Sequence, residues 1–176
     1  MSVSEELHES AEHASDSFSR RAGAGMAIIA AALAVVAVSG HIATTEELLT
    51  QQKAANQWAY YQAKAMRRYQ SDVAQDILST IPGESAAKAV EKYKANVERY
   101  EKEGEEISKQ AKEFEAESDL MGRRALRLHI GEIFLELAIV FSSLAILSRR
   151  SIFFYIAMTG AAMGLLVAVS VLLLRG

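Results

Sequence analysis

The sequence predicts an all-α membrane protein that has three transmembrane helices and a long helical hairpin, a coiled coil, between the first and the second. Residues 22–45 and 151–174 are two stretches of 24 residues without a formal charge, and residues 128–148 carry only two charges. Apolar runs of about 18 residues or more are typical of helices that span a membrane. The charged segment between the first two runs repeats its apolar residues in heptads, which is typical of a coiled coil.

The composition excludes several classes of protein. The chain has 176 residues, with 19 basic against 22 acidic residues, a net charge of −3 and no cysteine. A net charge close to zero argues against nucleic-acid binding, and without cysteine the chain forms no disulfide and no thiolate metal site. It contains no phosphate-binding glycine loop, no nucleophile elbow and no HExxH motif. We therefore expect a protein that is not an enzyme and that holds no cofactor and no metal.

Residues 1–21 precede the first predicted transmembrane helix. Residues 1–19 contain five acidic residues and no basic residue, and their apolar residues recur at helical spacing. An acidic tail and a short amphipathic helix both fit this pattern, and the sequence does not decide between them. The first transmembrane helix, residues 22–43, consists mainly of Gly, Ala, Val and Ile. Such small residues let helices approach closely in lipid.

Residues 44–127 are the predicted soluble part, with 14 basic and 15 acidic residues. The pair Pro82 and Gly83 lies near the middle of this segment. Proline presets the second position of a tight turn, and glycine tolerates the positive φ of the third. We therefore predict two antiparallel helices, residues 46–80 and 84–127, that fold back on each other at this turn.

Each predicted hairpin helix has one face that repeats in alternating steps of three and four residues. In the second helix this face, the second-helix seam, comprises Val90, Tyr93, Val97, Tyr100, Gly104, Ile107, Ala111, Phe114, Ser118, Met121, Ala125 and Leu128. The first-helix seam is more polar and comprises Leu48, Gln52, Ala55, Ala59, Gln62, Met66, Tyr69 and Val73. The second-helix seam is a coiled-coil pattern of about five heptads with weak layers at Gly104 and Ser118. Pairing within the chain, pairing between copies, or both would satisfy the two seams.

The second and third predicted transmembrane helices are residues 128–148 and 151–174, joined by a short connection. In the third, Gly160 and Gly164 form a small-xxx-small pair that favours close helix packing. Four arginines flank the first helix and the short connection, against one, Arg175, on the other side once the long hairpin is left out. Long segments follow the positive-inside rule poorly, which is the reason for leaving it out. This count predicts a cytoplasmic N-terminus and a hairpin outside.

Glu132 and Glu136 lie four residues apart on one face of the second predicted transmembrane helix. A charged side chain is costly to leave facing lipid, so we expect these acids to face a bundle interior or water, or to be protonated. In one interpretation they line a cation or proton pathway formed by several copies. In the other, Glu132 lies among lipid headgroups and Glu136 bonds to a neighbouring helix.

Two histidines lie at the ends of predicted transmembrane helices. His41 ends the first and His129 opens the second, so both are expected on the hairpin side of the membrane. Together with Glu132 they could form a small metal or proton site. Histidines that simply hydrogen-bond to water at the membrane surface are the alternative.

Residues 57–64, with the sequence QWAYYQAK, follow an alanine-rich apolar run and precede a charged helical region and two closely spaced apolar runs. This segment and this layout resemble an uncharacterised family of small bacterial membrane proteins known only as a domain of unknown function. The resemblance implies a multi-pass protein of the bacterial inner membrane with three spans, and it carries no catalytic residues over. Trp58 and Tyr61 are residue types that often anchor protein contacts, and packing inside the hairpin is the alternative.

The leading hypothesis is a non-enzymatic integral membrane protein that self-associates and acts as a scaffold or adaptor through its coiled-coil hairpin. Its expected partners are the lipid bilayer, further copies of the chain and a protein bound to the hairpin, with no nucleic acid. The expected contact residues are Trp58, Tyr61, Val90, Tyr93, Val97, Tyr100, Ile107 and Phe114. The alternative is a homo-oligomeric cation or proton pathway lined by Glu132 and Glu136, with His129 and His41. A third hypothesis is a membrane-bound enzyme that holds a metal between His41, His129 and Glu132.

Overall fold

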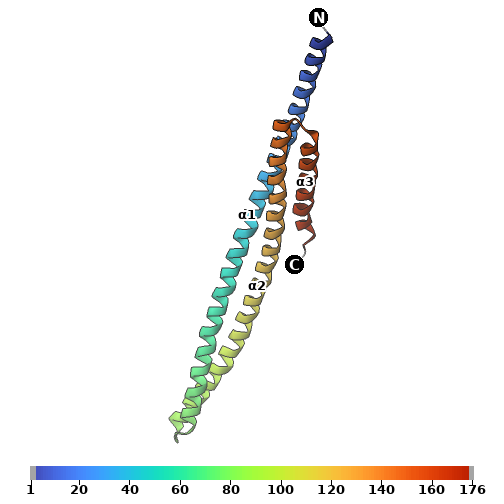
Figure 1. Cartoon of the computed structure of the whole chain (residues 1–176). Helices are drawn as coiled ribbons and strands as arrows, with labels where there is room; N and C mark the ends of the chain where they lie inside the picture. Colours follow the sequence, from blue (N-terminus) through green and yellow to red (C-terminus); the bar gives the residue numbers. More distant parts are fainter. Residues whose placement is uncertain (1–2, 175–176) are drawn as a thin grey trace. The chain divides into compact units, whose positions relative to one another are not determined.

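The computed structural model describes the backbone of residues 3–174 and the side chains of residues 17–174. Three long helices make up almost all of it, α1 at Val3–Ser79, α2 at Glu84–Ser148 and α3 at Ser151–Val169 (Figure 1). The 3₁₀ turn η1, Ser170–Leu173, follows α3. No strand occurs among residues 3–174, so the predicted all-α fold is confirmed.

Helices α1 and α2 are longer than the predicted elements, whereas α3 ends at Val169, before the predicted end at residue 174. Helix α1 continues without interruption from the N-terminal segment to the end of the first hairpin helix, and α2 joins the second hairpin helix to residues 128–148. The single proline lies between α1 and α2, so neither helix is broken by a proline in its interior. The segment that was predicted as an acidic tail or an amphipathic helix is helical from Val3 onward. The side chains of residues 1–16, which would show whether it has an apolar face, lie outside the described residues.

Each helix is apolar enough over part of its length to cross a membrane. Such segments lie within Ser17–Ser79, Glu84–Ser148 and Ser151–Leu173. Length and composition therefore indicate a membrane protein.

The chain divides into two compact units, which are described separately. The three-helix unit comprises residues 1–45 and 120–176, and the two-helix unit comprises residues 46–119. Ala125 belongs to the buried core of the three-helix unit. This unit therefore begins before the second apolar run, because the preceding turns of α2 already pack in its core.

Small side chains dominate the core of the three-helix unit. The buried cluster comprises Ile29, Val36 and Ala43 from α1, Ala125, Leu128, Leu135 and Ala138 from α2, and Ala161 and Ala168 from α3. Leu135 is completely buried. In lipid, apolar surface gains little by moving into a protein interior, so close approach through small residues becomes the main source of helix packing. Helices α2 and α3 accordingly lie side by side (Figure 1).

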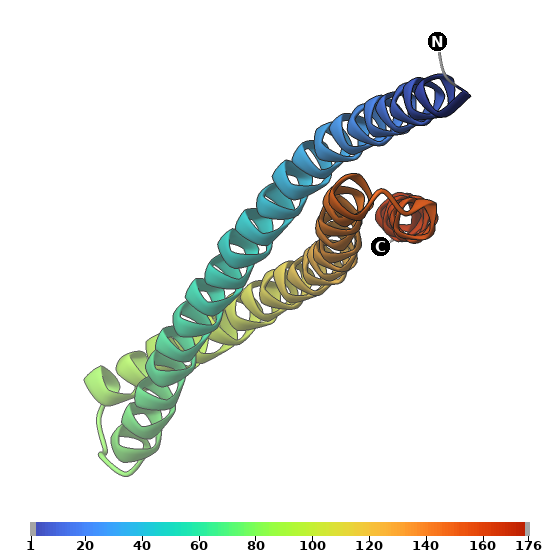
Figure 2. The same cartoon turned by 45° about the horizontal axis from the view of Figure 1, so that its top comes forward.

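The two-helix unit is an antiparallel hairpin (Figure 2). Gln57 donates a side-chain hydrogen bond to Gln110 at 3.3 Å, and Arg68, later in α1, donates to Glu101, earlier in α2, at 3.3 Å. The part of the second-helix seam that lies in this unit, residues 90–118, is buried or half-buried. The hairpin therefore uses the apolar seam of α2 as its inner surface.

The turn between α1 and α2 occupies residues 80–83. The amide of Ile81 donates to the carbonyl of Leu78 at 3.1 Å at the end of α1, and the amide of Ala87 donates to the carbonyl of Gly83 at 3.1 Å at the start of α2. Gly83 has a φ of +132°, a backbone conformation that residues with a Cβ rarely adopt. This turn is therefore the position where the fold depends on the conformational freedom of glycine.

We expect Gly83→Ala to lower the free energy of unfolding by about 1–2 kcal/mol, because a Cβ strains this backbone conformation. No heavy atom lies within 4 Å of the Cβ position, so the strain would be purely conformational. Denaturant unfolding followed by circular dichroism measures the change. Gly23→Ala is the matched control, because Gly23 also has no atom within 4 Å of its Cβ position but lies inside α1, where alanine is favourable. Equal stability of the two variants would contradict the prediction.

Candidate functional site

The three-helix unit contains a polar cluster centred on His129. The Nε2 atom of His129 lies 3.1 Å from Oγ1 of Thr44, and its Nδ1 atom lies 3.1 Å from Oε2 of Glu132. The ring of His41 contacts the ring of His129 edge to face, with 6.3 Å between their centroids. The structure thus brings together the two histidines and Glu132, as the sequence suggested, and adds Thr44.

Helix geometry explains why these side chains meet. His129 and Glu132 are three residues apart on α2, so they lie on the same face. On α1, Gly40 leaves space for the imidazole, because a Cβ at this position would lie 3.3 Å from Cε1 of His129. The side chain of Glu132 is 21% exposed and that of His129 is 40% exposed. The cluster is therefore partly exposed at the surface of the three-helix unit.

The imidazole of His129 can keep both of its hydrogen bonds in either of its charge states. A neutral imidazole with its proton on Nδ1 donates to the Glu132 carboxylate and accepts from the Thr44 hydroxyl. A protonated imidazole donates to both, because a hydroxyl oxygen can also accept. The same hydrogen bonds thus serve both charge states of His129. Among residues 17–174, no group of three His, Cys, Asp or Glu side chains could hold a metal ion.

Glu136 lies in a different environment from Glu132. Its side chain is exposed on the surface of the three-helix unit, and it forms no hydrogen bond or ion pair with any described residue. The two acids are four residues apart and so occupy neighbouring positions on one face of α2, yet Glu132 is half-buried and Glu136 is exposed. Within one chain, the two acids therefore do not line a common interior path.

Two arginines of α2 bind the carboxyl end of α3 and the turn that follows it. Arg127 donates to the carbonyl of Ser170 at 3.0 Å, and Arg124 donates to the carbonyl of Leu174 at 3.3 Å. The last carbonyls of a helix lack partners within the helix, and cations are favourable there. These contacts tie α3 to α2, so both arginines have a structural role.

The glycines of α3 lie at different distances from α2. A Cβ on Gly164 would lie 2.8 Å from the carbonyl oxygen of Gly131, and a Cβ on Gly131 would lie 2.8 Å from the carbonyl oxygen of Gly164. Gly160 is less crowded, because its Cβ position is 3.8 Å from the nearest atom, the carbonyl oxygen of Phe134. The closest approach of the two helices thus pairs Gly164 with Gly131, a residue that the sequence pattern did not single out. The sequence indicates this contact only weakly. Gly131 is the only glycine in residues 128–148, so it forms no glycine pair of the kind seen in α3.

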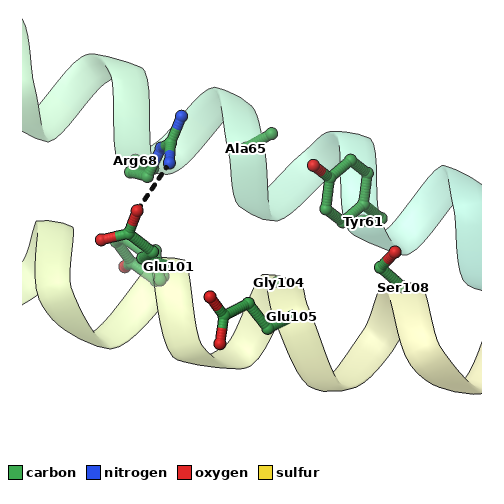
Figure 3. Close-up of a pocket in the computed structure, with 8 residues that line it drawn as sticks. Tyr61, Ala65, Arg68, Glu101, Gly104, Glu105 and Ser108 are labelled. Atoms are coloured by element: carbon green, nitrogen blue, oxygen red, sulfur yellow. Dashed lines mark hydrogen bonds and ion pairs between the residues drawn. The ribbon is translucent and has the colours of Figure 1, made fainter.

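In the two-helix unit, a groove of about 260 Å³ opens where the second-helix seam has its first weak layer (Figure 3). It is lined by Tyr61, Ala65, Arg68, Tyr100, Glu101, Gly104, Glu105 and Ser108. The groove exists because Gly104 has no side chain and Ala65 has a small one. Tyr61 partly fills the space, and its ring lies 3.5 Å from the Cβ position of Gly104. A second groove, of about 430 Å³, lies at the other weak layer, Ser118.

Lys64 is held tightly next to the first groove. Its ammonium lies 2.5 Å from Oε2 of Glu103 and within 5.5 Å of the ring centroids of Tyr60 and Tyr100. Only 12% of the Lys64 side chain is exposed. The hydrogen bond to Glu103, together with one to Tyr60, raises the pKa of Lys64, and the hydrogen bond from Lys64 lowers the pKa of Glu103. Both shifts favour the charged forms of the pair.

This pair predicts how the stability of the hairpin depends on pH. The lowered pKa of Glu103 gives a contribution that is present above the ordinary carboxyl pKa of 4.5 and is lost as the pH falls through the lowered value. The raised pKa of Lys64 gives one that is present below 10.5 and is lost as the pH rises through the raised value. Thermal unfolding across the pH range should show a plateau that falls at both ends. Glu103→Gln should weaken the fall at acid pH, and Glu106→Gln, an exposed acid nearby, should leave it unchanged.

The predicted contact residues of the hairpin lie between its two helices. Trp58 donates from Nε1 to Oε1 of Glu115 at 2.8 Å, and its ring packs edge to face on Tyr61 with 5.6 Å between centroids. The predicted contact residues of α2, which are Val90, Tyr93, Val97, Tyr100, Ile107 and Phe114, are all buried or half-buried. The α2 residues and Trp58 therefore pack within one chain, whereas Tyr61 is 36% exposed.

Comparison with known proteins gives one match. A family model described as a domain of unknown function, DUF4337, matches residues 18–174. Neither the curated proteins nor the solved structures contain a match. The resemblance to an uncharacterised family is thereby confirmed, whereas the role of the QWAYYQAK segment stays a prediction. Because the match covers nearly the whole chain, this protein belongs to the DUF4337 family.

Proposed function

We propose that this protein is a non-enzymatic, multi-pass membrane protein that self-associates and acts as a scaffold or adaptor. In this proposal each of the three helices crosses a bacterial inner membrane once, with the N-terminus in the cytoplasm and the hairpin outside. The observation that carries the proposal is the exposed carboxyl group of Glu136 in the middle of an apolar run.

The position of Glu136 is what makes its exposure informative. It lies about 12 Å along the helix from Leu128, where the apolar run begins. A carboxylate at the centre of a transmembrane helix costs about 3 kcal/mol when it faces lipid. The described part of a single chain offers no partner for it. A neighbouring helix from a second copy would cover this side chain and hydrogen-bond to it, at a gain of about 1 kcal/mol per bond.

The test is the oligomeric state of the full chain in several mild detergents, measured by light scattering. We expect one oligomer of constant size for the native chain and for Glu136→Gln, because glutamine keeps the interhelical hydrogen bond. Glu136→Leu should shift the population toward smaller species. Glu113→Leu is the matched control, since Glu113 is an exposed acid of α2 outside the apolar run. A native chain that is monomeric in every detergent would contradict self-association.

A second candidate function is a cation or proton pathway formed by several copies. It is supported by the hydrogen-bonded series of Thr44, His129 and Glu132, which accommodates both charge states of His129, and by Glu136 one turn further along α2. A carboxylate that lies on the outside of one chain can line a path between chains.

Reconstituted vesicles that contain a pH-sensitive dye test this candidate. A pathway predicts proton flux that Glu136→Gln abolishes and that His129→Gln reduces, whereas Glu113→Gln should leave it unchanged. Absence of flux at every pH, or flux that does not respond to Glu136→Gln, would rule the pathway out and leave the scaffold proposal in place.

A further inference from the structure

The first-helix seam does not face α2. All eight of its residues are exposed in the two-helix unit, with Leu48 59%, Met66 58% and Tyr69 65% exposed. The hairpin instead buries a different face of α1, represented by Thr50, Ala54 and Ser71.

These two faces of α1 lie on opposite sides of the helix. The buried residues follow seam residues Leu48, Gln52 and Tyr69 by two positions, which corresponds to a rotation of about 200°. Helix α1 therefore carries two heptad patterns. One is polar and pairs with α2, and the other is more apolar and has no partner in the described chain.

We propose that the first-helix seam pairs with the same seam of a second copy, in a parallel two-stranded coiled coil. The proposal rests on the proposed self-association and assigns it a surface in the two-helix unit. The alternating steps of three and four residues in the first-helix seam run from Leu48 to Val73 without interruption. A pattern of this kind keeps one face of a helix against a partner helix along its whole length.

The charge distribution favours an identical partner over a charged one. Residues 54–63 of α1 contain no charged residue. Most positions that flank the seam are uncharged, among them the exposed residues Gln51, Asn56, Ala63 and Gln70, and Asp72 is a charged exception. In a coiled coil these flanking positions determine partner choice through their charges, and here they bring few charges between two copies.

The outer surface of α2 differs sharply, because it presents charged residues such as Glu98, Glu105 and Lys109 to solvent. Two copies of this α2 surface would bring many charged side chains together. The outer face of α1 is therefore better suited to a contact between identical helices.

The seam residues themselves are suited to self-pairing. Gln52 and Gln62 each carry an amide that both donates and accepts, so each can hydrogen-bond to its own copy across a two-fold axis. Ala55 and Ala59 are small and permit close approach of two backbones. Counted back along the sequence in the same steps, the pattern reaches the alanines Ala34, Ala31 and Ala27, which are exposed in the three-helix unit.

The direction of pairing follows from the anchoring of the chain. Two copies whose α1 apolar segments, residues 22–43, lie in the same membrane enter the two-helix unit in the same direction along α1. Each seam residue would then face its own copy.

Disulfide crosslinking of the full chain tests the proposal, because the native chain has no cysteine. Single-cysteine variants Ala59→Cys, Met66→Cys and Val73→Cys occupy equivalent positions in successive heptads. Oxidation in native membranes should give each of them about five-fold or more covalent dimer than the control variants, because a disulfide needs Cα atoms within about 7 Å. The controls are Arg67→Cys, adjacent to the seam, and Lys102→Cys on α2, both at exposed positions.

The outcomes separate this inference from the proposed function. Dimer formation at all three seam positions supports parallel pairing, because an antiparallel pair would bring at most one of them next to its own copy. Equal crosslinking at Met66→Cys and Arg67→Cys would overturn the inference. So would rapid labelling of Met66→Cys by a soluble maleimide in a preparation that light scattering shows to be oligomeric, and in that case self-association itself would stand. A monomeric preparation would overturn both.

Discussion

Gly131→Ala is expected to lower the stability of the three-helix unit by about 2–3 kcal/mol, the upper part of the range for overpacking. The new Cβ would lie 2.8 Å from the carbonyl oxygen of Gly164 and 3.2 Å from the Cβ of Ala168. A backbone carbonyl in the middle of a helix cannot rotate away, so α2 and α3 would have to separate. Gly164→Ala should have an effect of similar size, because it places a Cβ against the carbonyl of Gly131.

Unfolding in mixed micelles with increasing SDS, followed by circular dichroism, measures this loss of stability. Gly160→Ala is the matched control in the same interface, since its nearest atom is 3.8 Å away, at an ordinary contact distance. We expect this variant to unfold close to the native midpoint. Stability of Gly131→Ala equal to that of Gly160→Ala would show that the two helices do not approach as closely as the structure indicates.

Leu135→Ala is expected to lower the stability of the same unit by about 2–5 kcal/mol, as typically follows when a fully buried leucine is truncated. Leu135 has no exposed surface and belongs to the core cluster together with residues from all three helices. Alanines such as Ala138 and Ala161 surround it, and their short side chains cannot extend into the space that the leucine would leave. The effect should therefore lie in the upper part of that range.

Leu137→Ala provides the comparison. Leu137 is two residues further along α2 and 49% exposed, so truncation removes few packing contacts. The same unfolding measurement should give a change well below 1 kcal/mol, as for most exposed positions. If Leu135→Ala and Leu137→Ala were equally stable, the three helices would not pack around Leu135.

The sequence predicts a packed helix face well where apolar residues form it and poorly where small or polar residues form it. The second-helix seam was visible because its apolar residues, such as Val97 and Ile107, contrast with charged neighbours. The inner face of α1 was not, because it is formed by small and polar residues such as Thr50 and Lys64. A search for apolar periodicity follows the other face of α1, which the structure leaves exposed.

The candidate site shows a similar division. That His41, His129 and Glu132 meet was one of two interpretations that the ends of the apolar runs allowed. The hydrogen bond between Thr44 and His129 and the exposure of Glu136 both depend on the rotation of α2 about its axis in the three-helix unit. The spacing of the two acids in the sequence does not determine this rotation. Gly131 was missed for a related reason, because its partner Gly164 lies in another helix and the pair exists only in three dimensions.

The polar contacts inside the hairpin also define how its two helices are aligned lengthwise. Apolar seams tolerate sliding by a whole heptad, because one aliphatic layer resembles the next. Here such a slip would move Lys64 from Glu103 to the neighbourhood of Gln110 or Asn96, and neither neutral amide replaces the ion pair. It would also break the bond from Trp58 to Glu115. A shifted alignment is thus disfavoured because it leaves charged groups without partners. Every copy of the chain therefore has the same lengthwise register of α1 against α2, and the outer face of α1 is the same in every copy.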